Sequence, residues 1–207
     1  MTHVAAPYAA VASASYPAVR LGFRTRWRGA ANVPPRGGAV VASNHLSNFD
    51  PFPLALGLYP RRQFRFMAKR ELFRFPLGQI LSLLGSFPVD RERADRSALA
   101  TAVRLCRDGH LLLMFPEGTR RAKGLRKRFD AAAHTGAAWI ALKAGVPLVP
   151  AAVAGTDRLS RLGPIRVAYG APLDLGDLAG TPTRQAAVEA TERLMERIGE
   201  LEAELGG

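Results

Sequence analysis

The side chains whose types and spacing best suit proton transfer are His45 and Asp50, five residues apart. No acidic residue precedes Asp50, so the first carboxylate of the chain appears within a basic region. Over a tight loop, this spacing lets the carboxylate accept a hydrogen bond from one imidazole nitrogen, which leaves the other nitrogen as a proton acceptor. The pair therefore suits a general base. Asp50 also directly precedes Pro51, where its side chain could cap a helix.

Three later segments combine turn residues, prolines and charged residues: GSFPVDR at residues 85–91, FPEGTR at 115–120 and VPLVP at 146–150. Arg91 and Arg120 end the first two of these segments. Taken alone, these arginines are more typical of a solvated surface, and EGT is typical of a turn. We expect the proline-rich segment to be an edge or irregular strand that builds a wall.

The segments around these residues alternate between strand and helix patterns, which predicts an α/β domain on a mixed sheet. Pro51 suits the first turn of a helix, and Gly145 should stop another. The last helix should begin at Thr183 and turn inward the side chains of Val188, Thr191, Met195, Ile198 and Leu201. Strands are expected at residues 23–28, 39–43, 64–68, 87–89, 110–115, 146–154 and 165–169, and the other helices at 51–58, 76–84, 94–107 and 135–144.

Charge is the unusual property of the composition, with a net charge of +12 over 207 residues. Residues 1–171 hold 26 Lys and Arg against 9 Asp and Glu, whereas residues 172–207 hold 3 against 8. A basic body favours an anionic partner, which could be a nucleic acid, an anionic membrane or a phosphorylated substrate. The single cysteine, Cys106, excludes an internal disulfide and is expected to be a buried apolar residue.

Several common signatures do not occur in the sequence: there is no P-loop, GxGxxG, GxSxG or HExxH motif. No run approaches 18 continuous apolar residues, so we expect no transmembrane helix. Residues 1–19 lack the charged start of a secretory signal and are expected to form a loose or short helical arm.

The blocks NHLSNFD, GSFPVDR, FPEGTR and VPLVP occur in this order between His45 and Pro150, over about half of the chain. In this respect the sequence strongly resembles the family of 1-acylglycerol-3-phosphate acyltransferases. The resemblance implies one acyltransferase domain at residues 20–207 with the glycerolipid acyltransferase fold, a largely parallel central sheet flanked by helices. It also implies an O-acyltransferase that moves a fatty acyl chain from acyl-CoA or acyl-carrier protein to the hydroxyl of a lysophospholipid. No cofactor and no metal are expected.

The resemblance also implies roles for individual residues. His45 would take the proton of the acceptor hydroxyl, and Asp50 would hold the imidazole in its tautomer and stabilise the imidazolium. Substrate binding would fall to Asn44, Lys69, Arg91, Glu117, Gly118, Thr119 and Arg120.

Two basic runs, at residues 61–74 and 120–128, predict a rim that faces an anionic membrane at its cytoplasmic side. Family members often carry hydrophobic N-terminal anchors, whereas only about twenty residues precede the first predicted strand here. Three alternatives stay open: another lyso-lipid acceptor, a hydrolase that uses the same His–Asp pair with water, and a basic nucleic-acid-binding module. No RNA-binding motif supports the last alternative, and no nucleic-acid partner is expected.

Overall fold

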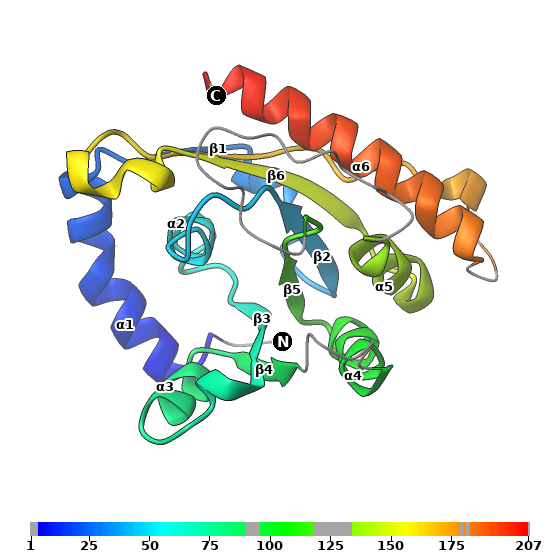
Figure 1. Cartoon of the computed structure of the whole chain (residues 1–207), viewed down its shortest axis with the longest axis horizontal. Coiled ribbons are helices and arrows are strands. Elements are labelled where there is room, and N and C mark those ends of the chain that lie inside the picture. Colours follow the sequence, from blue (N-terminus) through cyan, green and yellow to red (C-terminus); the bar gives the residue numbers. More distant parts are fainter. Residues whose placement is uncertain (1–3, 90–95, 118–133, 179, 181–182, 207) are drawn as a thin grey trace.

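The architecture is a seven-stranded sheet with helices on both faces (Figure 1). The computed structural model describes residues 4–89, 96–117, 134–178, 180 and 183–206. The strands lie in the order β1-β7-β6-β2-β5-β3-β4. Their bounds are β1 Arg26–Arg28, β2 Ala39–Ser43, β3 Phe64–Lys69, β4 Ser86–Val89, β5 Leu111–Met114, β6 Leu148–Ala154 and β7 Arg166–Tyr169.

Five adjacent strands, from β6 to β4, run parallel to one another. Strand β7 is antiparallel to β6, and β1 is parallel to β7. The prediction of a mixed, largely parallel sheet is therefore confirmed. Because the carboxyl ends of parallel strands meet at one edge, the loops after β2, β3, β4, β5 and β6 all leave from the same edge of the sheet.

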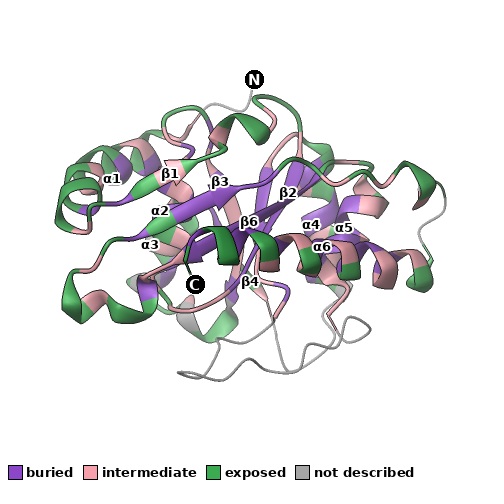
Figure 2. Ribbon diagram, turned by 90° about the horizontal axis from the view of Figure 1, so that it is seen from above, coloured by how far each residue is buried: buried purple, intermediate pink, exposed green. Residues whose placement is uncertain are grey.

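Strand β2 is the centre of the core, and all five of its residues are buried. Its side chains alternate between two layers, as the period of a strand requires. Val40 and Ala42 pack with α4 (Arg96–Arg107), α5 (Gly136–Ala144) and α6 (Arg184–Glu204), whereas Ala39 and Val41 pack on the side of α2 (Pro51–Leu56). Both faces are thus covered, which explains the continuous apolar run (Figure 2). Cys106 lies in the α4 layer, where burial raises the pKa of its thiol to about 12.

The first described residues form α1 (Ala6–Pro17), followed by a π-helical turn, Ala18–Gly22. Tyr8, Ala12 and Val19 are buried and pack with Leu56 of α2. Helix α1 therefore lies along the outside of α2, with α3 (Leu77–Leu83) near its amino end (Figure 1). A boundary between residues 19 and 20 stays a prediction.

No helix among the described residues is both long and apolar enough to cross a bilayer.

Two details of the predicted elements were wrong. Helix α6 starts after Thr183, whose hydroxyl oxygen accepts the N–H of Ala186 at 3.0 Å. Of its five predicted inward residues, Thr191, Ile198 and Leu201 are buried as expected. Val188 and Met195 are only partly buried. The residues that α6 buries are Ala187, Ala190, Thr191, Leu194, Ile198, Leu201 and Glu202.

Strand β6 is an interior strand, although its two prolines predicted an edge or irregular strand. Pro147 precedes the strand, and Pro150 pairs with Ala42 of β2. The carbonyl of Pro150 accepts the N–H of Gly170 at 2.8 Å, just beyond the last β6–β7 pair. The backbone N and O of one strand residue point to the same neighbouring strand, so the N of Pro150 also points toward β7 and away from β2. Since β7 has already ended there, the missing N–H of Pro150 removes no hydrogen bond between β6 and β2.

Arg62 stabilises the amino edge of the sheet, where the parallel strands begin. This edge lies opposite to the one from which the loops after these strands leave. Its guanidinium donates to the carbonyls of Pro34 (2.8 Å), Gly37 (2.7 Å) and Gly109 (3.0 Å), which lie on the approaches to β2 and β5. The residue is only 3% exposed, and burial together with the nearby Arg61 lowers its pKa. Arg62 is therefore a structural residue, and its predicted place in a membrane-facing rim was wrong.

Candidate active site

The loop that joins β2 to α2 brings His45 and Asp50 together. It turns tightly because the N–H of Asp50 donates to the carbonyl of Ser47 at 3.1 Å, after which Pro51 begins the helix. Helix α2 is itself held in place, since Tyr169 Oη donates to the carbonyl of Leu54 at 2.5 Å. The loop is thus fixed at one end by a central strand and at the other by an anchored helix.

Asp50 is fully buried and accepts four hydrogen bonds. Its Oδ2 accepts from His45 Nδ1 (2.8 Å), Leu46 N (2.7 Å) and Ser47 N (2.8 Å), and its Oδ1 accepts from Thr156 Oγ1 (2.5 Å). Because Oδ2 already accepts from two backbone N–H groups, we assign the proton in the His–Asp bond to Nδ1. In this tautomer, Nε2 of a neutral ring carries the lone pair.

Asp50 does not cap α2, although it occupies the N-cap position. Its carboxylate turns back onto the N–H groups of Leu46 and Ser47, so the capping prediction was wrong.

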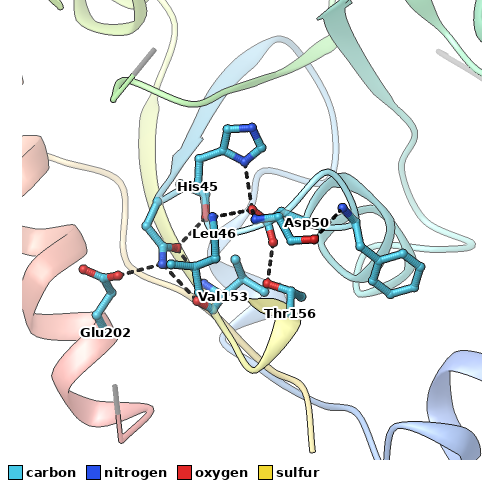
Figure 3. Close-up of polar contacts among 10 residues, drawn as sticks. His45, Leu46, Asp50, Val153, Thr156 and Glu202 are labelled. Carbon is cyan, nitrogen blue, oxygen red and sulfur yellow. Dashed lines mark hydrogen bonds and ion pairs between the residues drawn. The ribbon is translucent and has the colours of Figure 1, made fainter. Parts of the chain in front are cut away.

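The ring of His45 is held in its plane with Nε2 directed away from Asp50 (Figure 3). Phe115 stacks on the imidazole, with ring centroids 4.1 Å apart and an interplanar angle of 19°. The His45 side chain keeps 12% of its surface exposed. A substrate hydroxyl can therefore reach an oriented ring nitrogen, and this is the geometry that a general base requires.

Asn44 was predicted to bind substrate, but it is fully buried. Its Nδ2 donates to the carbonyl of Val153 (2.9 Å) and to Glu202 Oε1 (2.6 Å), and its Oδ1 accepts from Val153 N (2.8 Å) and Ser43 Oγ (3.1 Å). Both donor hydrogens and both acceptor positions of the amide are in use. The prediction is corrected: Asn44 joins the start of the β2–α2 loop to Val153 of β6 and Glu202 of α6 (Figure 3).

The other predicted blocks fall on or beside strands of the parallel set. Glu117 is partly exposed and lies three residues after β5, the strand beside β2. Lys69 ends β3 and pairs in register with Val89 of β4. The remaining predicted ligands, Arg91, Gly118, Thr119 and Arg120, lie outside the described residues. Within the described ranges, no group of three His, Cys, Asp or Glu side chains is placed to hold a metal ion.

A family model described as acyltransferase matches residues 24–154, a range that contains the loop of His45 and Asp50 and the strands around it. The chain belongs to the acyltransferase family.

Relatives in this acyltransferase family are similar over most of the chain. A 1-acyl-sn-glycerol-3-phosphate acyltransferase from Bacillus subtilis is 35% identical over 178 residues, which cover 84% of this chain and 86% of the relative. Its counterpart from Salmonella typhimurium is 29% identical over 194 residues, or 89% of this chain and 76% of the relative.

A solved structure supports the acyltransferase fold. The crystal structure of the 1-acyl-sn-glycerophosphate (LPA) acyltransferase PlsC from Thermotoga maritima superposes with a TM-score of 0.69 at 25% identity. The match covers 95% of this chain and 78% of that one.

Sequence reasoning missed three residues of this acyltransferase site: Phe115, Thr156 and Glu202. Phe115 opens the FPEGTR block, so its position beside the site followed from the order of the strands. Thr156 and Glu202 are 106 and 158 residues away in sequence from their partners Asp50 and Asn44. No local pattern marks either contact.

Proposed function

We propose that this acyltransferase is a 1-acyl-sn-glycerol-3-phosphate acyltransferase that takes its acyl chain from acyl-CoA or acyl-carrier protein. The observation that carries the proposal is the 2.8 Å bond between His45 Nδ1 and an anchored Asp50, which leaves Nε2 as a base. The family and its relatives supply the type of reaction to which this base belongs.

In the reaction, the free hydroxyl of the acceptor attacks the carbonyl carbon of the thioester. Nε2 of His45 removes the hydroxyl proton as the C–O bond forms, and Asp50 stabilises the imidazolium without accepting the proton itself. The tetrahedral intermediate then collapses, the C–S bond breaks, and the leaving thiolate takes the proton from Nε2. A general base of this kind accelerates a reaction about 10²–10⁴-fold. No acyl-enzyme intermediate is required.

We assign the acceptor's phosphate to Arg91 and Arg120, with Lys69 as a third cation. Arg91 follows β4 by two residues and Arg120 belongs to the segment that follows β5, both strands of the parallel set. The assignment is supported by this order of strands, because segments that follow parallel strands start at the edge that holds His45. Charge-assisted bonds to a phosphate are stronger than neutral ones, and arginine can form two at once.

We place the enzyme peripherally on an anionic membrane surface, at its cytoplasmic side. The segment after β3 supports a membrane contact, since Arg70 and Arg74 are exposed and Phe75 is 82% exposed. This segment starts from the same edge of the sheet as the catalytic loop, so a lipid acceptor held there would be within reach of the site. A basic residue beside an anionic bilayer contributes about 1 kcal/mol.

The experiment that tests the function is thiol release from a long-chain acyl thioester by purified protein on lipid vesicles. Acyl-CoA and acyl-carrier protein are compared as donors, and lysophosphatidic acid is compared with other lyso-lipids and with no acceptor. We expect release only with an acceptor, fastest with lysophosphatidic acid, and unaffected by a chelator. Equal release without an acceptor would identify a thioester hydrolase instead, and a preference for another lyso-lipid would change the acceptor.

Vesicle binding tests the location separately. Arg70→Gln and Arg74→Gln should weaken binding to anionic vesicles and reduce its salt sensitivity, since such attraction is screened over about 10 Å at about 0.1 M salt. Arg61→Gln is the matched control, because this exposed arginine precedes β3 at the opposite edge. Equal losses from all three variants would show that only overall charge matters.

A further inference from the structure

The turn after β6 holds both ends of the catalytic loop. Val153, near the end of the strand, exchanges two backbone bonds with the amide of Asn44, directly before His45. Three residues later, Thr156 donates its hydroxyl proton to Asp50 Oδ1 at 2.5 Å. The loop that carries the base is therefore fixed at residue 44 and at residue 50 by one neighbouring segment (Figure 3).

Thr156 meets the one oxygen of Asp50 that the loop itself does not bind. The other oxygen, Oδ2, already accepts from His45, Leu46 and Ser47. Asp50 is fully buried and Thr156 is 1% exposed, so bulk water does not replace the hydroxyl. Without this donor, Oδ1 would lose its hydrogen bond from Thr156 in a buried site, and nothing described would keep the carboxylate from rotating.

The backbone before Thr156 is shaped for this contact. Gly155 has a φ of 89°, a conformation that favours glycine. A Cβ at this position would lie 2.4 Å from the carbonyl oxygen of Pro164, so another residue would displace the turn. Gly155 thus allows the sharp exit from β6 that brings the Thr156 hydroxyl to Asp50.

We propose that Thr156 is a positioning residue for the acyl transfer: its hydroxyl fixes the orientation of the Asp50 carboxylate, so that His45 keeps its proton on Nδ1 and presents Nε2 to the acceptor. This assignment rests on the proposed function for its kinetic consequence. The effect on the tautomer of His45 follows from the geometry alone.

The test compares Thr156→Val, which removes the hydroxyl at nearly constant volume, with Thr156→Ser, which keeps it. Thr191→Val is the matched control, because Thr191 is also 1% exposed and its hydroxyl donates to the carbonyl of Ala187 at 2.7 Å, within α6. The first readout is steady-state kinetics. The second is the ¹⁵N chemical shifts of the His45 ring in the free protein, assigned from the signals that His45→Ala removes.

We expect Thr156→Val to lower kcat about 10–100-fold, as the loss of a hydrogen bond to a charged group predicts, with KM for donor and acceptor changed much less. Its His45 spectrum should show a mixture of tautomers, whereas wild type shows the Nδ1–H form. Thr156→Ser should restore kcat and the single tautomer, and Thr191→Val should match wild type in both readouts.

Wild-type kcat and tautomer in Thr156→Val would overturn the assignment, and so would a serine variant as impaired as the valine variant. If the valine variant does not fold, Thr156→Cys, with a weaker donor of similar size, is assayed in its place and should fall between valine and serine. If wild type transfers no acyl chain to any acceptor, the proposed function fails, and the ¹⁵N comparison still decides the role of Thr156.

Discussion

Two histidines lie at opposite ends of neighbouring strands and have opposite environments. His45 follows β2 at the carboxyl edge of the sheet, and His110 directly precedes β5 at the amino edge. His45 bonds a carboxylate that two backbone N–H groups already hold. His110 has its pKa lowered by burial and by Arg65 and Arg62, and Asp108 counteracts this only in part.

The difference shows why His45, in contrast to His110, is placed to act as a base. Both histidines have an aspartate within five residues in the sequence, so proximity along the chain does not separate them. Of the two aspartates, only Asp50 is buried, and two backbone N–H groups hold its carboxylate in addition to the imidazole. At the amino edge, the buried charge belongs to Arg62, whose donors are directed to backbone carbonyls and stabilise loops.

The largest difference between the two histidine sites should appear when the aspartate near each histidine is replaced by asparagine. Asp50→Asn should lower kcat about 10²–10⁴-fold, because an amide can present a donor to Nδ1 and favour the wrong tautomer. Asp108→Asn is the control and should leave kcat within about 2-fold of wild type, since Asp108 makes only a minor electrostatic contribution at His110. Steady-state kinetics on the folded variants measures kcat of both. Comparable losses of kcat would show that the aspartates at the two edges of the sheet do not differ in their effect on catalysis.

Arg62→Met should lower the free energy of unfolding, whereas kcat should stay nearly unchanged. It leaves three carbonyls without their buried donor, at about 1–3 kcal/mol for each carbonyl that water cannot reach, so we expect a total loss of roughly 2–4 kcal/mol. Denaturant unfolding should show the loss, while kcat of the folded fraction stays near that of wild type.

Arg61→Met is the matched control for this change, because the exposed Arg61 makes one bond, to the carbonyl of Ala30 at 2.6 Å. If Arg62→Met unfolded no more easily than this control, the amino edge would not depend on the buried arginine.

Arg91→Ala and Arg120→Ala should separate phosphate binding from proton transfer. Each should lower kcat/KM for lysophosphatidic acid about 10–100-fold, chiefly through KM, if the phosphate contacts are equal in ground and transition states. An acceptor without the phosphate should barely distinguish these variants from wild type. Normal use of lysophosphatidic acid by Arg91→Ala would refute the acceptor assignment and leave the His45–Asp50 pair untouched.

The smallest effect should be a change in the pH dependence of stability in His110→Gln. The pKa of His110 is lower in the folded chain than its ordinary value of 6.5, so the unfolded chain binds more protons as the pH falls through that value. Wild type should therefore lose a little stability between pH 7 and about pH 5, and His110→Gln should lose less. Unfolding at several pH values measures this, and parallel curves for the two proteins would show that His110 titrates normally.

The sequence predicted the elements well where one local pattern dominated. Residues 39–43 are a run of small and β-branched apolar residues, and β2 has these same bounds. Gly145 adopts a left-handed conformation and ends α5 as expected. The stripe of α6 was right only in part, because small residues such as Ala187 and Ala190 are buried, whereas the pattern favoured the larger Val188 and Met195.

The site was predictable only in part, for a physical reason. The His45–Asp50 bond is local, so its spacing in the sequence could indicate it. Arg62 and Asn44 were misassigned because their partners are mostly backbone atoms of distant segments, which no side-chain pattern reveals. Thr156 escaped notice because its partner, Asp50, is 106 residues away.

The most direct test of the account is acceptor-dependent thiol release by His45→Ala, with His110→Ala as the matched histidine control. Each variant is first shown to be folded by its unfolding transition. We expect His45→Ala to lose at least about 10²-fold in kcat with lysophosphatidic acid present, and His110→Ala to stay near wild type. Near-normal acyl transfer by folded His45→Ala would contradict the assignment of His45 as the base.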